Sequence, residues 1–171
     1  MLWAAQGFGT GRIPWAPGTW GSLLGIPLTW VLLHYCGLAA AWIITGLLIL
    51  AAVPICGAAE LILGRRDPGS VVLDEIAVMP LVSLPATTAV VLFQTPEWRA
   101  ALLATSGKWY GSDVTFFAVG FLAFRLFDIW KPGPIRLSQR LAGGWGVVAD
   151  DVLAALAASS VPLLLLAVIR R

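Results

Sequence analysis

The sequence predicts an all-α membrane protein, a bundle of four to five apolar helical segments preceded by a glycine-rich N-terminal loop. Of its 171 residues, 59% are apolar and only 12% are charged, against about 45–50% and 25% in soluble domains. Several apolar runs approach the roughly 20 residues that a helix needs to cross a bilayer. The length fits one domain, residues 1–171.

The N-terminal region, residues 1–22, is expected to be a Gly/Pro-rich interfacial loop. Residues 7–22 contain five glycines and two prolines, too many for a regular helix. Such a loop offers backbone N–H groups that can bind an anion. Composition favours the simpler interpretation, a loop that lies at the membrane surface and is anchored there by Trp15 and Trp20.

Three apolar segments follow. Residues 23–36 are short and interrupted by a proline, so they form either a packed short span or a re-entrant segment. Residues 38–56 contain no charge and predict a full span. Residues 71–93 form the third segment, in which Pro80 and Pro85 are expected to kink or break the helix.

The second half of the chain alternates polar and apolar stretches. Residues 94–113 are expected to form a polar connecting segment, a solvated loop or a short surface helix. An apolar run at 114–130 follows, then a basic, glycine-rich stretch at 132–146. The last predicted span is 147–169.

Arg125, Asp128 and Lys131 give the run at 114–130 an ionic end. Residues three apart on a helix are neighbours, so Asp128 can contact both cations. The prolines that follow Lys131 end the helix. An ionisable residue inside a membrane segment costs about 3 kcal/mol, so such residues are interpreted first as functional. The alternative is an ion pair that only neutralises itself.

The acidic residues are expected to lie on one side of the membrane. Asp74-Glu75 begin the third apolar segment, Asp128 ends the fourth, and Asp150-Asp151 begin the fifth. Because successive spans alternate in direction, these positions share a side. With the N-terminus inside, six cations lie on that side and four on the other, which favours a cytoplasmic site. The six are Arg12, Arg65, Arg66, Lys131, Arg136 and Arg140.

Five carboxylates at one interface repel one another unless cations lie among them. Arg125 and Lys131 supply part of the positive charge, and a divalent cation would supply the rest. With one histidine in the chain, His34, the ligands would be oxygens, which suit Mg²⁺. A net charge of +2 gives no indication of nucleic-acid binding. The residues alone indicate a membrane enzyme or transporter that handles an anionic phosphate with a divalent metal.

Four blocks of the sequence match motifs of a known family. They are GFGTG at 7–11 with PGTWGS at 17–22, DPGSVVLDE at 67–75, FRLFDIWKPGPIR at 124–136, and GGWGVVADD at 143–151. In these blocks and their order the chain resembles the phosphatidylglycerophosphatase A family. The connection from Glu75 to Arg125 is longer than the family usually has.

The resemblance implies a Mg²⁺-dependent, multi-pass lipid phosphatase of the bacterial inner membrane. Its substrate would be phosphatidylglycerophosphate, hydrolysed to phosphatidylglycerol in phospholipid biosynthesis, and no nucleic acid would be involved. The candidate metal ligands, one of which would act as general base or nucleophile, are Asp74, Glu75, Asp128, Asp150 and Asp151. Lys131 is the sixth candidate catalytic residue. The candidate substrate-binding residues are Arg12, Thr19, Ser22, Arg125 and Arg136.

Two other functions compete with this interpretation. A non-enzymatic transporter would use the carboxylates as an ion path, but they cluster at one side and none lies within residues 38–56. A lipid phosphotransferase would use similar acids, although its Asp-Gly-x2-Ala-Arg signature is missing. Cysteine-based and histidine-based phosphatase motifs are missing as well. The oligomeric state stays open.

Overall fold

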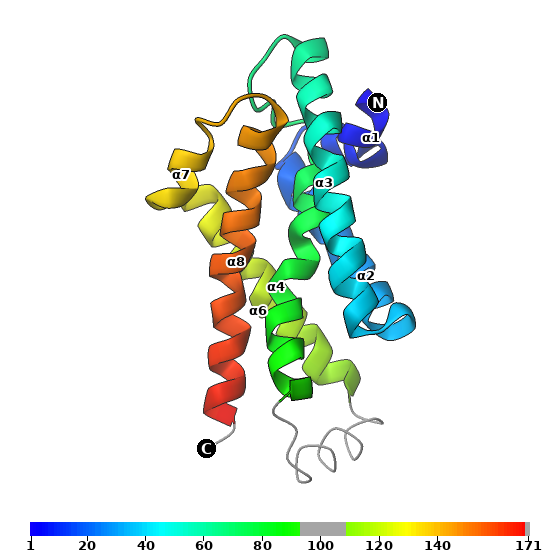
Figure 1. Ribbon diagram of the computed structural model, residues 1–171, viewed down its shortest axis with the longest axis vertical. Helices are drawn as coiled ribbons and strands as arrows, with labels where there is room; N and C mark the ends of the chain where they lie inside the picture. The colour runs from blue at the N-terminus through cyan, green and yellow to red at the C-terminus, as the bar shows by residue number, and fades with distance from the viewer. Residues whose placement is uncertain (93–108, 170–171) are drawn as a thin grey trace.

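The regular structure is helical in every part of the chain that the computed structural model describes, residues 1–92 and 109–169 (Figure 1). The all-α prediction is confirmed for these residues. The elements are α1 (Leu2–Ala5), η1 (Gly7–Arg12), α2 (Pro17–Val31), η2 (Leu32–Cys36), α3 (Leu38–Leu63), α4 (Leu73–Leu92), α6 (Trp109–Trp130), α7 (Pro134–Ser138) and α8 (Gly144–Ile169).

The five long helices alternate in direction. In Figure 1, α3 and α6 run towards the end of the molecule at which α2, α4 and α8 begin. The predicted acidic positions at the start of α4, the end of α6 and the start of α8 therefore share one end of the molecule. The prediction that these charges lie together is confirmed, and the side of the membrane stays a prediction.

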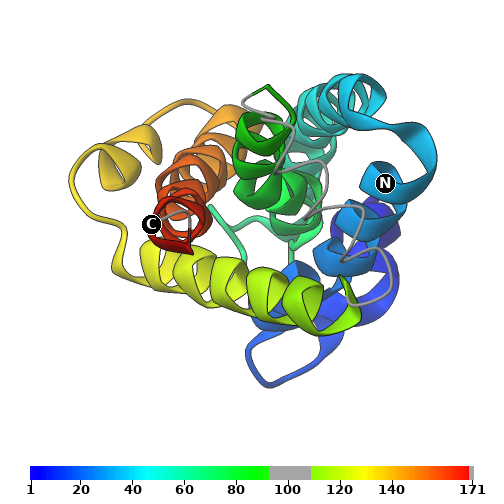
Figure 2. The ribbon, with the colours of Figure 1, turned by 90° about the horizontal axis from the view of Figure 1, so that it is seen from below.

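Helix α4 lies at the centre of the molecule, packed against α2, α3 and α8, and α6 packs on α8 (Figure 2). The main core contains Val78 and Val82 of α4, Phe124 of α6 and Ala154 of α8, all fully buried. The small residues of α8 let its neighbours approach closely. Gly144 is an example, because a Cβ there would collide with the main-chain carbonyl of Val53 in α3.

Among the described residues, two helices have the length and composition to cross a membrane, α3 and residues 144–164 of α8. Only 17% of the apolar window of α3 is buried. Large apolar side chains such as Ile43, Leu47 and Leu50 are exposed on it. An apolar surface of this kind is typical of contact with lipid or a partner.

The expected N-terminal loop is wrong over most of residues 1–22. Helix α1 and the short η1 come first, and α2 already begins at Pro17. A proline is favoured in the first turn of a helix, where its missing N–H has no helical partner to lose. Part of η1 does need glycine-like freedom, because Phe8 and Gly9 have positive φ values of 58° and 108°.

The prolines inside α2 and α4 do not break these helices. Pro27 lies inside α2, and α4 runs without interruption through Pro80 and Pro85. Helices packed among other apolar helices tolerate proline because their neighbours compensate for the lost hydrogen bond. The polar connecting segment predicted at 94–113 falls mostly outside the described residues. Its last five residues belong to α6, which begins at Trp109, so that boundary is wrong.

Candidate active site

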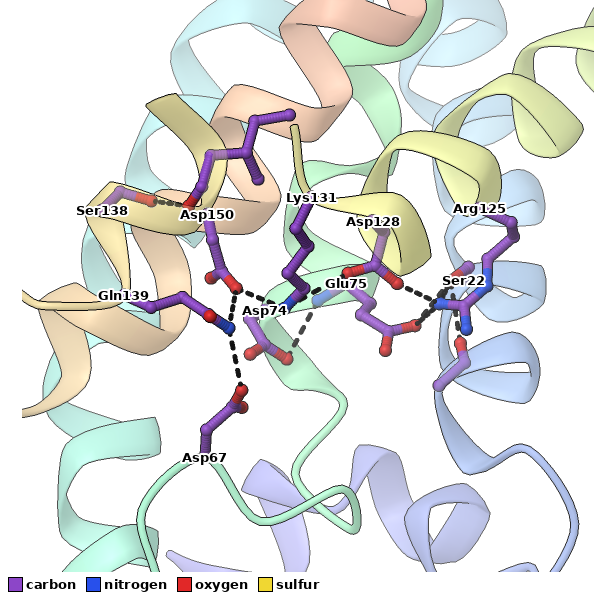
Figure 3. Close-up of polar contacts among 12 residues, drawn as sticks. Ser22, Asp67, Asp74, Glu75, Arg125, Asp128, Lys131, Ser138, Gln139 and Asp150 are labelled. Carbon is purple, nitrogen blue, oxygen red and sulfur yellow. Dashed lines mark hydrogen bonds and ion pairs between the residues drawn. The ribbon is translucent and has the colours of Figure 1, made fainter. Parts of the chain in front are cut away.

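A continuous line of polar contacts crosses the end of the molecule at which α4 and α8 begin (Figure 3). One half of the line joins α2, α4 and α6. Arg125 Nη1 donates to Asp128 Oδ2 at 2.7 Å and to Glu75 Oε2 at 3.1 Å. Ser22 Oγ of α2 donates to the same Glu75 oxygen at 2.5 Å. The predicted contact between Arg125 and Asp128 is confirmed, and Arg125 also reaches α4.

The other half of the line joins the end of α6 to α8. Lys131 Nζ lies 3.7 Å from Asp128 Oδ1 and 2.5 Å from Asp150 Oδ2. Gln139 Nε2 donates to that same Asp150 oxygen at 2.9 Å and to Asp67 Oδ2 at 3.3 Å. The predicted pair of Asp128 and Lys131 is confirmed. Acidic and donor side chains thus alternate from Ser22 to Asp67.

Local backbone geometry places two of these contacts. Lys131 has φ 44°, a left-handed conformation that non-glycine residues rarely adopt, and its N–H still donates to the Phe127 carbonyl. Backbone strain of this kind is typical of functional sites. Gly18, in the first turn of α2, lies against the Glu75 carboxylate, which a Cβ there would displace.

Lys131 carries its charge in a half-buried position. Burial alone lowers the pKa of its amine, but the hydrogen bond that the amine donates to Asp150 and the charges of Asp150, Asp128 and Asp151 outweigh it and raise the pKa above its usual range. The amine is therefore protonated at neutral pH. A fixed positive charge beside several carboxylates suits a site for an anionic substrate.

Asp74 and Asp151 lie beside this line without joining it. Each is only 4% exposed, and within the described residues neither forms an ion pair. Asp74 Oδ1 accepts only the N–H of Glu75, at 3.0 Å. In the described part of the chain, Asp150 Oδ1 is buried without a hydrogen-bond partner. Buried carboxylates without a cation are costly, so this donor set fits a positive ion.

The remaining candidates lie outside the line. Arg12 Nε donates to Gln6 Oε1 at 2.9 Å, and Thr19 stands three residues before Ser22 on α2. Arg136 lines a cleft beside the site. Conversely, the line includes Asp67 and Gln139, which the sequence analysis missed. Asp67 opens a matched block, which was a usable signal, whereas nothing in the sequence marked Gln139.

Comparison with known proteins gives one family. The family model described as phosphatidylglycerophosphatase A matches residues 3–166. The chain belongs to the phosphatidylglycerophosphatase A family. It is 37% identical to a phosphatidylglycerophosphatase A of Haemophilus influenzae over 89% of this chain and 80% of that protein. It is 34% identical to one of Escherichia coli over 88% of this chain and 74% of that protein.

A third relative has a different name. This protein of Bacteroides thetaiotaomicron is provisionally named a phosphatidylinositol-3-phosphatase, and it is 33% identical over 86% of this chain and 82% of its own length. No solved structure matches the chain. The site geometry of this phosphatidylglycerophosphatase A family member therefore comes from its own fold.

The acidic side chains of the site determine how this family member could hold a metal ion. In the described residues, no three His, Cys, Asp or Glu side chains converge at metal-binding distance. Mg²⁺ needs only one or two carboxylates, because it keeps waters and takes substrate phosphate oxygens. Asp74 and Asp151 are the two candidates for that role, because Glu75 and Asp128 are engaged by Arg125, and Asp150 by Lys131. The magnesium prediction remains a prediction.

Proposed function

We propose that this chain hydrolyses the terminal phosphate monoester of phosphatidylglycerophosphate and releases phosphatidylglycerol and inorganic phosphate. Membership of the phosphatidylglycerophosphatase A family supports the substrate. The observation that carries the proposal is the line of alternating charges next to Asp74 and Asp151, which are buried and form no ion pair within the described residues. Such a site can bind a dianionic phosphate only with added positive charge, which is the chemistry of a metal-dependent phosphatase.

The metal in this proposal is Mg²⁺. Asp74 and Asp151 would hold it. Bound Mg²⁺ would supply Lewis-acid stabilisation of the charge that develops on the phosphoryl oxygens. Lys131 and Arg125 are the protein's own cations at the site. Their present carboxylate partners keep them oriented, and a phosphate oxygen can share their N–H groups.

The reaction itself is a displacement at phosphorus. Water attacks the phosphorus, the bond to the glycerol oxygen breaks, and the water proton passes to a carboxylate. Glu75 and Asp128 are the two candidates for this base, because Arg125 holds an oxygen of each within the site. The carboxylate then returns this proton to the glycerol oxygen, which leaves as an alcohol. Ser22 keeps Glu75 in place through its 2.5 Å hydrogen bond.

The proposed setting is the bacterial inner membrane, with α2 (extended by η2), α3, α4, α6 and α8 crossing it and the site on the cytoplasmic side. The alternating directions of these helices support five crossings. Arg65, Arg66, Arg136 and Arg140 lie in the connections from α3 to α4 and from α6 to α8, at the site's end, as expected of a cytoplasmic face. Exposed Trp3 and Trp15 in the N-terminal region suit the membrane interface.

The test is phosphate release from phosphatidylglycerophosphate by detergent-purified protein with Mg²⁺ or with EDTA. Release that requires Mg²⁺ is expected. Asp128→Asn should lower the rate about 10²-fold or more, because it removes a candidate base and unpairs Arg125. Asp113→Asn, near the other end of the same helix, is the matched control and should retain the rate.

Two results would contradict the proposal. An equal rate of phosphate release in EDTA and in Mg²⁺ would exclude a role for the metal in the reaction. No release from folded protein would exclude the substrate, and phosphatidylinositol 3-phosphate would then be tested because of the Bacteroides relative. If neither lipid is hydrolysed, a non-enzymatic transporter becomes the favoured function.

A further inference from the structure

A cleft of about 630 Å³ opens beside the line of polar contacts, between the end of α3, the turn after it, α7 and the start of α8. Three arginines line it, Arg66, Arg136 and Arg140. Its acidic residues are Glu60 and Asp67. With three positive and two negative side chains, the cleft has an excess of one positive charge. The start of α8 adds the partial positive charge of a helix N-terminus.

The arginines are not neutralised by ion pairs. Within the described residues, none of the three has a carboxylate at ion-pair distance. Arg66 is held by neutral groups, since its Nη2 donates to the main-chain carbonyls of Gln139 at 2.7 Å and Leu141 at 3.1 Å. The two acids already accept N–H groups: Glu60 from the Asp67 main chain at 2.7 Å, and Asp67 from Gln139. The cleft is thus prepared for a singly charged anion.

One side chain is shared by the cleft and the candidate active site. Gln139 lines the cleft, and its amide bonds both Asp67 in the cleft and Asp150 in the site (Figure 3). An anion in the cleft therefore lies one side chain away from Asp150. A ligand with two phosphates joined by a short polyol can occupy both places at once.

The rim of the cleft is apolar. Leu137 lines it and is 56% exposed, and the nearby Leu141 and Trp145 are also about half exposed. A polar floor with an apolar rim suits an amphipathic ligand better than free phosphate. An acyl chain that leaves the cleft over α7 would cover these side chains.

We propose that this cleft binds the phosphodiester of the lipid substrate, the phosphate that is not hydrolysed, while the terminal monoester lies at Asp150 and Lys131. The inference rests on the proposed function and extends it to substrate selection. Charge decides which phosphate lies where. A diester carries one negative charge, which matches the excess of one positive charge in the cleft, whereas a doubly charged monoester needs the stronger positive charge proposed for the aspartate site.

The specificity-determining residue on this basis is Arg140. It lines the cleft and, within the described residues, takes part in no ion pair or side-chain hydrogen bond that its loss would break. Its neighbourhood offers a matched control in Arg65, which carries the same charge next to Arg66 but does not line the cleft. Arg65→Gln reproduces any general loss of attraction to anionic lipid.

The experiment uses two competing probes of the full-length protein in neutral detergent. Dioctanoyl phosphatidylglycerol has the diester alone, and inorganic phosphate stands for the monoester. Arg140→Gln is expected to weaken the binding and inhibition by dioctanoyl phosphatidylglycerol about tenfold, since one charged hydrogen bond is lost. Inhibition by phosphate should stay within about twofold of wild type on the same basis, and Arg65→Gln should alter neither.

Several outcomes would overturn the proposal. If Arg140→Gln weakens the binding of inorganic phosphate and leaves the binding of dioctanoyl phosphatidylglycerol unchanged, the cleft binds the monoester. If both variants weaken the binding of dioctanoyl phosphatidylglycerol equally, they act by reducing the general attraction of the protein to anionic lipid, and the cleft is not a subsite. If neither variant changes either probe, Arg140 does not bind substrate. Direct binding of dioctanoyl phosphatidylglycerol by calorimetry needs no turnover, so it tests the cleft even if phosphatidylglycerophosphate is not hydrolysed.

Discussion

Lys131 Nζ lies 2.5 Å from Asp150 Oδ2, and this ion pair joins the end of α6 to the first turns of α8. The lysine extends from a backbone with φ 44°. Because a non-glycine residue rarely adopts this conformation, the ionic partners of the amine maintain it. The strained backbone of Lys131 lowers the stability of the fold, and it places a charged amine at the candidate active site.

Lys131→Gly and Lys131→Ala separate these two aspects. Both remove the amine, so both should lower phosphate release about 10²-fold or more, the usual cost of a lost charge-stabilising donor. Glycine accepts the left-handed backbone without strain, so the glycine variant should be about 1 kcal/mol more stable than the alanine variant. Thermal unfolding in detergent measures the difference. Equal stability of the two would mean that residue 131 is not left-handed, and unchanged rates would remove the amine from the chemistry.

The pH dependence of stability follows from the same amine. The pKa of Lys131 is raised in the folded protein. A group of this kind contributes stability that is fully present below its unfolded pKa, about 10.4 for lysine, and that is lost as the pH rises through the folded pKa. The difference in melting temperature between wild type and Lys131→Met should thus be constant from about pH 7 to 9. A difference that falls within this range would mean that the amine loses its proton there.

The contacts of Arg125, Asp128 and Lys131 could be predicted from sequence because helical spacing alone brings residues three apart together. The shared end of α4, α6 and α8 followed from alternating directions. By contrast, the contacts from Ser22 and Gln139 join residues 53 and 11 positions apart. They depend on how α2 and the segment after α7 pack, which no local pattern records.

The start of α2 shows a second limit of sequence patterns. The two glycines and the proline of residues 17–22 indicated a loop, yet Pro17 starts the helix and Gly18 lets it approach Glu75. Composition shows that a glycine is present. It does not show whether that glycine makes a loop flexible or lets two helices pack closely, because close packing depends on a residue far away in the chain.

Gly18→Ala tests this close approach. A Cβ at Gly18 would lie 2.9 Å from Glu75 Cδ and push the carboxylate away from Ser22 and Arg125. Displacement of a reacting group by about 1 Å can cost up to 10²-fold, so the rate of phosphate release should fall about 10- to 100-fold while the protein stays folded. Gly46→Ala is the control, since nothing lies near a Cβ there and the position is helical. A wild-type rate for Gly18→Ala would show that Glu75 need not keep its place.

Metal binding can be measured without turnover, through the opposite effects of two kinds of aspartate. Asp74 and Asp151 are buried and, in the described residues, without an ion pair, so Asp74→Asn and Asp151→Asn should raise the melting temperature in EDTA. The same variants should lose the stabilisation that Mg²⁺ gives to wild type. Asp128→Asn should instead lower the melting temperature in EDTA, because it leaves Arg125 and Lys131 with fewer partners, and should keep a shift with Mg²⁺. If Mg²⁺ stabilises Asp74→Asn and Asp151→Asn as much as wild type, the ion binds elsewhere, and the two aspartates have a different cation or stay protonated.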